Sequence, residues 1–311
     1  MTSPPELRTI RDWLRYGVSR FNAAGLVYGH GTSNALDETA YLILQTLHLP
    51  IDQLDPFLDA RLTAREIDSV HAIIEARITT RKPAPYLTNN AWIQGHGFYV
   101  DERVLVPRSY IGELLGGGLD QIIGDPASIT TILDLCTGSG CLAILAALAF
   151  PGASVDAADI SSDALAVARR NVADYGLEPR VALHAGDLFA PLGGRRYDLI
   201  VSNPPYVDAK AMAALPPEYR HEPVLALASG DDGLDITRRI LRDAGPHLTP
   251  GGVLIVEVGR GRDALEAAFP ALPFSWLDTE LSEAEVFWLS AQDLVALDAG
   301  TAPKRRTRDR G

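Results

Sequence analysis

The sequence predicts an α/β protein with a small N-terminal helical domain, a β-hairpin linker and then a doubly wound, mainly parallel sheet. Two observations support this prediction. From about residue 130 onward, apolar runs of strand length alternate with helical stretches, which is typical of parallel βαβ units. Ahead of that region, residues 6–24 place apolar side chains at three- and four-residue spacing, as on one face of an amphipathic helix. The chain has 311 residues, which is enough for both parts.

Three helices are expected within the helical domain, which we assign to residues 1–85. They cover residues 6–24, 36–47 and 63–80. Pro50 helps to end the second helix, because proline cannot continue one. Thr63 and Glu66 form a capping-box pair that begins the third.

The rest of the chain divides into a linker, a sheet domain and a tail. Residues 86–110 form the linker, in which Trp92–Val106 alternates weakly around two glycines and predicts a β-hairpin. The sheet domain, residues 111–300, contains strand-like runs at 131–135, 153–158, 181–184, 197–201, 253–258 and 286–289. Helices are expected between them at 141–150, 163–175, 234–244 and 262–269. The basic segment 301–311 predicts a disordered tail.

The net charge of the chain is acidic and unevenly distributed. It totals −12, with −1 in residues 1–112, −15 in residues 113–301 and +4 in the last ten residues. This balance argues against sequence-tolerant binding to DNA or RNA. The longest apolar run, Cys141–Phe150, is shorter than the roughly 20 residues that span a membrane. Two cysteines and no secretory signal predict a cytoplasmic protein without a disulfide framework.

A glycine-containing turn follows the first strand of the predicted sheet. The turn contains Thr137, Gly138 and Gly140, with Asp134 in the strand before it. Because glycine has no Cβ, the backbone can turn tightly there and a ligand can approach closely. Asp159 closes the second strand, where a carboxylate is placed to accept the hydroxyls of a ribose, and Asp187 follows the third strand. Three acids at successive strand ends are expected to face one crevice.

These acids leave several interpretations open. A dinucleotide fingerprint has a third glycine, and this turn has Ala143 at that position, which some such proteins tolerate. Asp134 would repel a pyrophosphate and suits a cationic amino-acid ligand such as S-adenosylmethionine. Alternatively, Asp134 only caps a loop and Asp159 only caps the next helix. The two cysteines near the turn lack a partner cluster of His or Cys, so no metal site is predicted.

The most specific motif in the chain is the tetrapeptide after the fourth strand. It consists of Asn203, Pro204, Pro205 and Tyr206. The two prolines restrict the backbone, so the Asn203 side-chain oxygen and the Pro204 carbonyl can converge on one small spot. Two fixed acceptors suit a planar NH₂ group, over which Tyr206 can stack. The alternative is a Pro-Pro turn that only ends a strand.

These motifs resemble those of the class I S-adenosylmethionine-dependent methyltransferases that modify a glutamine side-chain amide. The resemblance covers residues 6–300 and extends to four further segments. They are Pro85–Thr88, Val106–Ser109, Asp134–Cys141 and Glu218–Pro223. The first helix and Tyr28–Thr32 look like the branch that methylates a glutamine of large-subunit ribosomal protein L three. The sister branch acts on peptide-chain release factors and more often has a GTGTG turn.

The resemblance implies a Rossmann-like methyltransferase sheet and a role for each motif residue. Asp134, Thr137, Gly138 and Gly140 would line the methionine end of S-adenosylmethionine, with Asp159 at the ribose and Asp187 by the adenine. Asn203, Pro204, Pro205 and Tyr206 would hold the glutamine, and Asn203 would also adjoin the cofactor. Arg108 and Glu222 would form a pocket wall, or else a purely structural ion pair. The helical domain would recognise the substrate.

The predicted function is therefore methylation of a ribosomal-protein glutamine, on the free protein before ribosome assembly. Two alternatives stay open besides the release-factor branch: an adenine-N6 nucleic-acid methyltransferase, which would need a basic groove, and a non-catalytic binding module, which leaves the Asn203–Tyr206 motif unexplained. The acidic residues near that motif, Glu218, Glu222, Asp231 and Asp232, are expected to form a negative rim that attracts a basic ribosomal protein.

Overall fold

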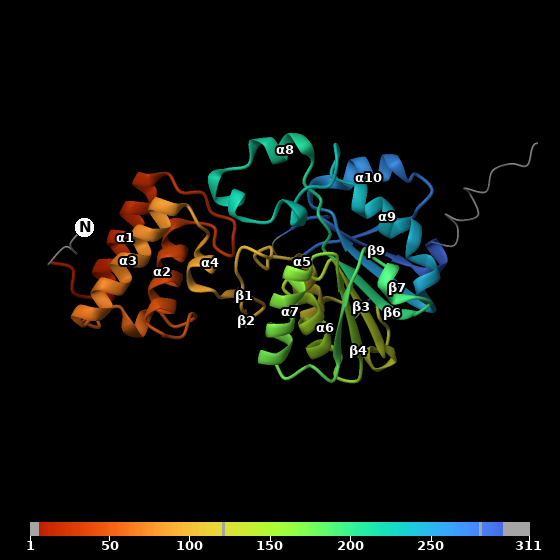
Figure 1. Cartoon of the computed structure of the whole chain (residues 1–311), viewed down its shortest axis with the longest axis horizontal. Helices are drawn as coiled ribbons and strands as arrows, with labels where there is room; N and C mark the ends of the chain where they lie inside the picture. The colour runs from red at the N-terminus through yellow and green to blue at the C-terminus, as the bar shows by residue number, and fades with distance from the viewer. Residues whose placement is uncertain (1–5, 120–121, 280–281, 295–311) are drawn as a thin grey trace, which may run out of the picture. The chain divides into compact units, whose positions relative to one another are not determined.

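The computed structural model describes residues 6–119, 122–279 and 282–294. The chain divides into two compact units (Figure 1). The helical unit comprises Met1–Arg108 and Ala214–Val224, and the sheet unit comprises Ser109–Ala213 and Leu225–Gly311. The sequence predicts a separate linker at 86–110 and assigns residues 214–224 to the sheet domain. The structure instead groups most of the linker, and all of residues 214–224, with the helices.

The helical unit contains the three expected helices and the expected hairpin. Its elements are α1 (Ile10–Ala24), α2 (Ala35–Thr46), α3 (Ala64–Thr80), α4 (Ala84–Thr88), β1 (Ala91–Ile93) and β2 (His96–Phe98). Helix α1 begins at Ile10 rather than at residue 6, because Thr9 and Asp12 form a capping box there. The capping box predicted for Thr63 and Glu66 is confirmed.

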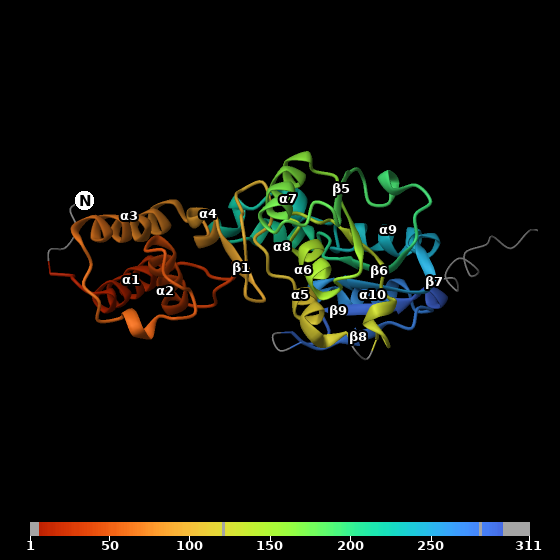
Figure 2. The same ribbon diagram turned by 90° about the horizontal axis from the view of Figure 1, so that it is seen from below.

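Helices α1, α2 and α3 pack around one hydrophobic core (Figure 2). The side chains of Trp13, Phe21, Leu42 and Ile74 are fully buried in it. A Cβ added at Gly17 would lie 2.4 Å from Cγ2 of Thr39, so glycine is what permits α1 and α2 to approach closely at this point.

The sheet unit is built on a seven-stranded sheet in the order β5-β4-β3-β6-β7-β9-β8. The strands are β3 (Thr131–Leu135), β4 (Ser154–Asp159), β5 (Val181–Ala185), β6 (Tyr197–Ser202), β7 (Leu248–Glu257), β8 (Ser275–Leu277) and β9 (Val286–Ser290). Strands β3 to β7 are parallel to one another, and β9 is antiparallel to both β7 and β8. This confirms the doubly wound, mainly parallel prediction. Strand β8 escaped prediction because three half-buried residues give no readable alternation.

The helices of the sheet unit lie between these strands along the chain. They are α5 (Tyr110–Glu113), α6 (Cys141–Ala149), α7 (Ser162–Asp174), α8 (Ala209–Ala214), α9 (Asp235–Asp243) and α10 (Arg262–Ala268). The four predicted helices agree within one residue at each end, and the short α5 and α8 were not expected. Short helical turns occur at Asp55–Phe57, Leu114–Gly118, Pro126–Ser128, Ala190–Leu192, Pro217–His221, Val224–Ala226, Gly245–His247 and Gly259–Gly261. Within the described ranges, no helix is both long and apolar enough to span a membrane.

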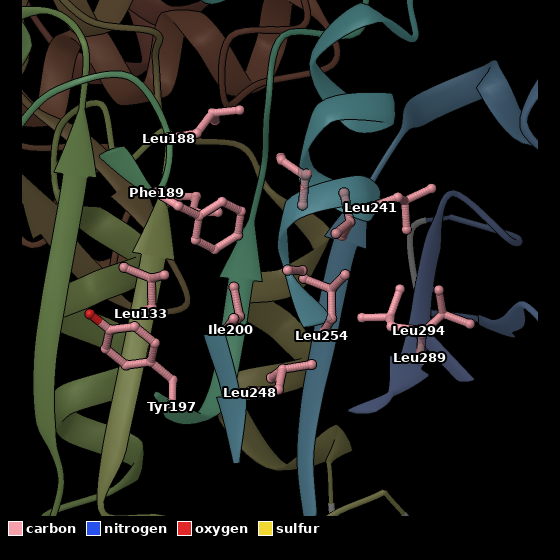
Figure 3. Packing of buried hydrophobic residues seen from close by; sticks show 14 of the residues in the cluster. Leu133, Leu188, Phe189, Tyr197, Ile200, Leu241, Leu248, Leu254, Leu289 and Leu294 are labelled. Atoms are coloured by element: carbon pink, nitrogen blue, oxygen red, sulfur yellow. The ribbon is translucent and has the colours of Figure 1, made fainter. Parts of the chain in front are cut away.

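A hydrophobic cluster covers one face of the sheet and fixes which side chains point away from it. Leu133, Ile200 and Leu254 extend from β3, β6 and β7 into this cluster, where Leu241 of α9 meets them (Figure 3). Side chains alternate along a strand, so Asp134 points to the opposite face, where α6 lies. The sheet order reverses next to β3, and ligands of such folds bind at the carboxyl ends of the strands at this switch point.

Candidate active site

At the turn after β3 lies a buried carboxylate that has no cationic partner among the described residues. Asp134 is fully buried, and its Oδ2 accepts hydrogen bonds from the Thr137 hydroxyl (2.5 Å) and the Ala143 N–H (3.0 Å). Its Oδ1 bonds to none of the described residues. Burial raises the pKa of Asp134 to about 7, against the opposing effect of these hydrogen bonds. When ionised, this carboxylate makes the turn electrostatically favourable for a cation.

Glycine is needed at the two positions of the turn for different physical reasons. Both have positive φ, +56° at Gly138 and +80° at Gly140. A Cβ on Gly140 would lie 3.2 Å from Cβ of Ala168, so this glycine permits α6 and α7 to pack. A Cβ on Gly138 would instead project into open space, with only the Cys136 carbonyl oxygen 4.0 Å away. Gly138 therefore leaves room beside the turn that a ligand can fill.

Asp159 is held at the end of β4 by backbone donors. Its Oδ2 accepts from the Gly138 N–H (2.9 Å) and its Oδ1 from the Ser161 N–H (2.8 Å). The residue is partly exposed, and burial raises the pKa of its carboxyl. Each carboxylate oxygen can accept a further hydrogen bond, as binding the two hydroxyls of a ribose requires.

Asp187 follows β5, so the structure confirms that the three acids occupy the ends of three neighbouring strands. Unlike the other two, Asp187 is exposed, and its Oδ2 lies 2.7 Å from the guanidinium of Arg239 on α9. Both side chains are about half exposed, so this is a surface ion pair of small energetic value. Its contact with an adenine stays a prediction.

The Asn203–Tyr206 motif directly follows β6, the strand on the other side of β3. The Ser202 hydroxyl donates to the Leu135 carbonyl oxygen (2.9 Å) and so joins the ends of β6 and β3. Pro204 is buried, whereas Asn203 and Tyr206 are partly exposed. The motif thus lies next to the glycine turn, and its two polar side chains remain accessible.

Glu257 contacts this motif and is not among the site residues that the sequence predicts. It ends β7, the strand next to β6, and is 1% exposed. The Tyr206 hydroxyl donates to Glu257 Oε1 (3.2 Å), while the Ser109 hydroxyl (2.6 Å) and the Tyr110 N–H (3.0 Å) donate to Oε2. Burial raises the pKa of Glu257 to about 7. The signal that could have revealed it is a single acid at the end of the apolar run Val253–Val258.

Arg108 and Glu222 are bound to each other within the helical unit. The guanidinium nitrogens of Arg108 lie 2.5 Å and 2.7 Å from the two carboxylate oxygens of Glu222. The Val106 N–H also donates to Glu222, and His30 lies 3.4 Å away. The structure thus shows the ion pair that the sequence left as one of two alternatives. A role for these residues in a substrate pocket stays a prediction.

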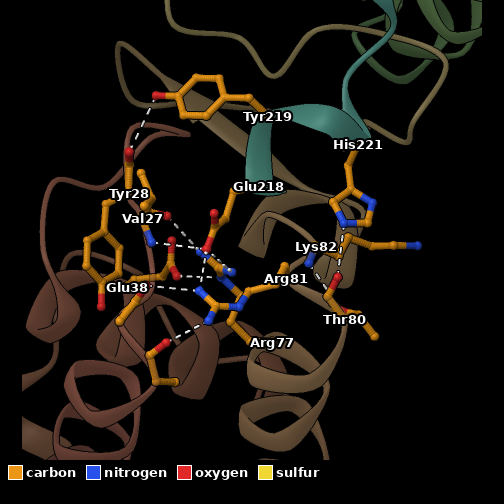
Figure 4. Close-up of polar contacts among 12 residues, drawn as sticks. Val27, Tyr28, Glu38, Arg77, Thr80, Arg81, Lys82, Glu218, Tyr219 and His221 are labelled. Carbon is orange, nitrogen blue, oxygen red and sulfur yellow. Dashed lines mark hydrogen bonds and ion pairs between the residues drawn. The ribbon is translucent and has the colours of Figure 1, made fainter. Parts of the chain in front are cut away.

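The predicted negative rim is wrong for two of its four residues. Glu218 and Glu222 are 0% and 3% exposed, and both are neutralised by arginines. Figure 4 shows Glu218 beside Arg77 and Arg81, with Val27 donating its N–H to the carboxylate. Only Asp231 and Asp232 are exposed, and Asp232 pairs with Arg238. No group of His, Cys, Asp and Glu among the described residues could hold a metal ion.

The sheet order, the glycine turn and the Asn203–Tyr206 motif define a class I S-adenosylmethionine-dependent methyltransferase. Residues 121–215 match the family described as Methyltransferase small domain. Three relatives are each named ribosomal protein uL3 glutamine methyltransferase, and the chain belongs to that family. The relative from Burkholderia pseudomallei is 57% identical over 303 residues, covering 95% of this chain and 99% of its own. Those from Bradyrhizobium diazoefficiens (59%, covering 93% and 92%) and Neisseria gonorrhoeae (58%, covering 93% and 97%) are equally similar.

Proposed function

We propose that this protein transfers a methyl group from S-adenosylmethionine to the side-chain amide nitrogen of a glutamine in ribosomal protein uL3. The observation that carries the proposal is the Asn203–Tyr206 motif at the end of β6, next to the acidic glycine turn after β3. The names of the relatives supply the identity of the substrate.

The residues of the turn fit this cofactor. S-adenosylmethionine, when bound, supplies an electrophilic methyl group on a positively charged sulfonium. Asp159 would hold the ribose hydroxyls, and Gly138 leaves the open space that the cofactor needs. Asp134 contributes its uncompensated charge through space, because its carboxylate is fully enclosed by protein. We assign Thr137 to holding Asp134 in place, and Asp187 to the adenine end.

Asn203 and Pro204 prepare the glutamine amide for attack. An amide nitrogen is a poor nucleophile because its lone pair is delocalised into the carbonyl group. The Asn203 side-chain oxygen and the Pro204 carbonyl would each accept one N–H hydrogen, which localises the lone pair and aims it. Holding the reacting atoms about 3–3.5 Å apart then supplies much of the rate. As the new N–C bond forms, the bond between the methyl group and the sulfonium sulfur breaks, its electron pair stays on the sulfur, and one N–H proton leaves the amide.

Tyr206 and Pro205 complete this loop. The Tyr206 ring would stack on the planar amide and exclude water, while Pro205 stiffens the backbone between the acceptors and the ring. The helical unit is assigned to binding the rest of uL3. We infer that free uL3, before ribosome assembly, is the substrate, because its glutamine is then accessible.

The test is methyl transfer to defined acceptors. The protein is incubated with methyl-labelled S-adenosylmethionine and, separately, with unassembled uL3, a peptide-chain release factor, a glutamine peptide and DNA. Label on a single glutamine of uL3 is expected, with slower labelling of the release factor and none of DNA. Label on DNA alone would replace the proposal with an adenine-N6 methyltransferase, and label on no acceptor would favour a binding module.

A further inference from the structure

Glu257 has no part in the function proposed so far, although it touches the motif that carries it. Its Oε1 accepts a hydrogen bond from the Tyr206 hydroxyl. Its Oε2 accepts from the Ser109 hydroxyl and the Tyr110 N–H. One buried carboxylate at the end of β7 thus joins the motif after β6 to the start of helix α5.

The environment of Glu257 is unusual for a buried acid. Among the described residues its hydrogen-bond donors are two hydroxyls and one backbone N–H, and none of them carries a positive charge. Burying a carboxylate with neutral partners alone costs free energy that an apolar side chain would not. Stability therefore does not explain why an acid is present here, and its contact with Tyr206 offers a different reason.

Two glycines pack closely against Tyr206, one at its ring and one at its backbone carbonyl. A Cβ on Gly259 would lie 2.7 Å from Cε2 of the Tyr206 ring, and a Cβ on Gly233 would lie 2.3 Å from the Tyr206 carbonyl oxygen. Both glycines have positive φ. Gly259 thus packs against one edge of the ring, Gly233 packs against the backbone that carries it, and the hydrogen bond to Glu257 holds the hydroxyl.

Ser109, the first residue of the sheet unit, extends this arrangement to the N-terminus of helix α5. Its hydroxyl accepts from the Ile111 N–H (3.2 Å) and caps α5, while donating to Glu257. The hydroxyl is thus satisfied as both donor and acceptor. The carboxylate therefore cannot turn away from Tyr206 without giving up its hydrogen bonds from the Ser109 hydroxyl and the Tyr110 N–H.

We propose that Glu257 is a positioning residue for methyl transfer, which holds the Tyr206 ring in the orientation that stacks on the target amide. The inference rests on the proposed function, because it requires that Tyr206 contacts the amide. Transfer to a delocalised amide nitrogen depends on alignment, and a misplacement of about 1 Å can cost about 10²-fold in rate. Loss of the bond that orients the Tyr206 ring should therefore lower kcat while leaving cofactor binding unchanged.

The test is a double-mutant cycle on Glu257→Gln and Tyr206→Phe. Glutamine keeps the shape of the side chain but replaces one acceptor oxygen with a donor, so it cannot accept from all three partners. Each single variant should lower kcat toward uL3 by about 10-fold or more, with the dissociation constant of S-adenosylmethionine within about threefold of the unsubstituted protein. If Glu257 acts through the Tyr206 hydroxyl, the double variant should be no slower than Tyr206→Phe alone.

Glu285→Gln is the matched control, because Glu285 acts on Glu257 only through space. It should retain kcat within about twofold. Full activity of Glu257→Gln would overturn the proposal, and so would losses that multiply in the double variant. Should Glu257→Gln fail to fold, as judged by thermal unfolding, Tyr206→Phe decides alone: undiminished kcat would overturn the proposal, and a reduced kcat with unchanged cofactor affinity would support it.

The two proposals fail in different ways. If the unsubstituted protein labels uL3 and Glu257→Gln does so equally fast, only the role of Glu257 is wrong. If the unsubstituted protein does not label uL3 at all, the proposed function is wrong.

Discussion

The two units of this chain treat buried carboxylates in opposite ways. In the helical unit each of the three buried glutamates is paired with arginine: Glu38 with Arg77, Glu218 with Arg77 and Arg81, and Glu222 with Arg108. In the sheet unit, the hydrogen-bond donors to Asp134 and Glu257 among the described residues are hydroxyls and backbone N–H groups. One unit neutralises its buried acids internally, and the other does not.

The pKa values of these buried carboxyl groups also differ between the helical unit and the sheet unit. Burial opposes ionisation of Glu222, but the charge and hydrogen bonds of Arg108, together with the nearby His30, outweigh it and lower its pKa to about 2. Burial raises the pKa of Asp134 and of Glu257 to about 7. Glu38 is intermediate, since burial raises its pKa in spite of Arg77.

This contrast separates stability from function. The paired charges of the helical unit anchor residues 214–224, as Figure 4 shows for Glu218. The unpaired charges of the sheet unit lie at strand ends, where a sulfonium and a glutamine amide would react. Positions that sacrifice stability in this way are candidates for function.

The largest expected effect comes from breaking the internal pairing of the helical unit. Arg77 is fully buried, and Arg77→Ala would leave the buried Glu38 carboxylate without the arginine that pairs with it. We expect the free energy of unfolding to fall by about 3–5 kcal/mol, measured by urea denaturation. Arg11→Ala, which breaks the exposed pair with Asp59, should cost less than about 1 kcal/mol. Equal losses in the two variants would refute the distinction.

Removing an unpaired charge from the sheet unit should instead affect ligand binding. Asn at position 134 can keep the hydrogen bonds from Thr137 and Ala143, so Asp134→Asn should fold normally. Its affinity for S-adenosylmethionine should fall by about 10-fold, equivalent to about 1.4 kcal/mol. Its affinity for the uncharged-sulfur product, S-adenosylhomocysteine, should fall less. Isothermal titration with both compounds measures this, and equal losses would contradict a role for charge.

Much of this comparison could not have been predicted from the sequence. The doubly wound sheet follows from the alternation of apolar runs and helical stretches. Asp134, Asp159 and Asn203 follow from local patterns as well, because each lies at or directly after the end of an apolar run. The pairing of Glu218 with Arg81 joins residues 137 positions apart, so nothing local indicates that residues 214–224 belong to the helical unit. Glu257 was missed for a related reason: its partners Ser109 and Tyr206 are distant in sequence and meet only in the folded sheet.

The pH dependence of stability should sharpen the contrast. The folded-state pKa of Asp134 and of Glu257, about 7, lies above the unfolded values of about 3.9 and 4.3. The stability that their protonated forms provide is complete below pH 4 and is lost as pH rises through 7. As the pH rises from 5.5 to 8, each of the two acids should therefore lower the free energy of unfolding by about 1–2 kcal/mol. In Asp134→Asn, the free energy of unfolding measured by urea denaturation should depend less steeply on pH. An unchanged pH dependence would argue against a buried neutral acid at position 134.

The smallest effect concerns substrate capture. Residues 113–301 still carry a net charge of −15, although Glu218 and Glu222 do not contribute to an exposed rim. Raising salt from 50 to 500 mM is expected to lower kcat/KM for intact uL3 by roughly threefold to tenfold, with little change for a neutral glutamine peptide. Initial rates of methyl labelling, measured at 50 and 500 mM salt, give the ratio of kcat/KM values for each of the two substrates. If kcat/KM for the two substrates is equally sensitive to salt, electrostatic attraction does not assist the capture of uL3.

If the cofactor and the glutamine amide are held by different residues at the strand ends, Asn203→Ala should separate methyl transfer from cofactor binding. Single-turnover methylation of uL3 and equilibrium binding of S-adenosylmethionine are measured on the same preparation. We expect turnover to fall by about 10²-fold or more while cofactor affinity stays within a few-fold. A collapse of cofactor affinity, or undiminished turnover, would contradict the assignment of Asn203 to the glutamine amide.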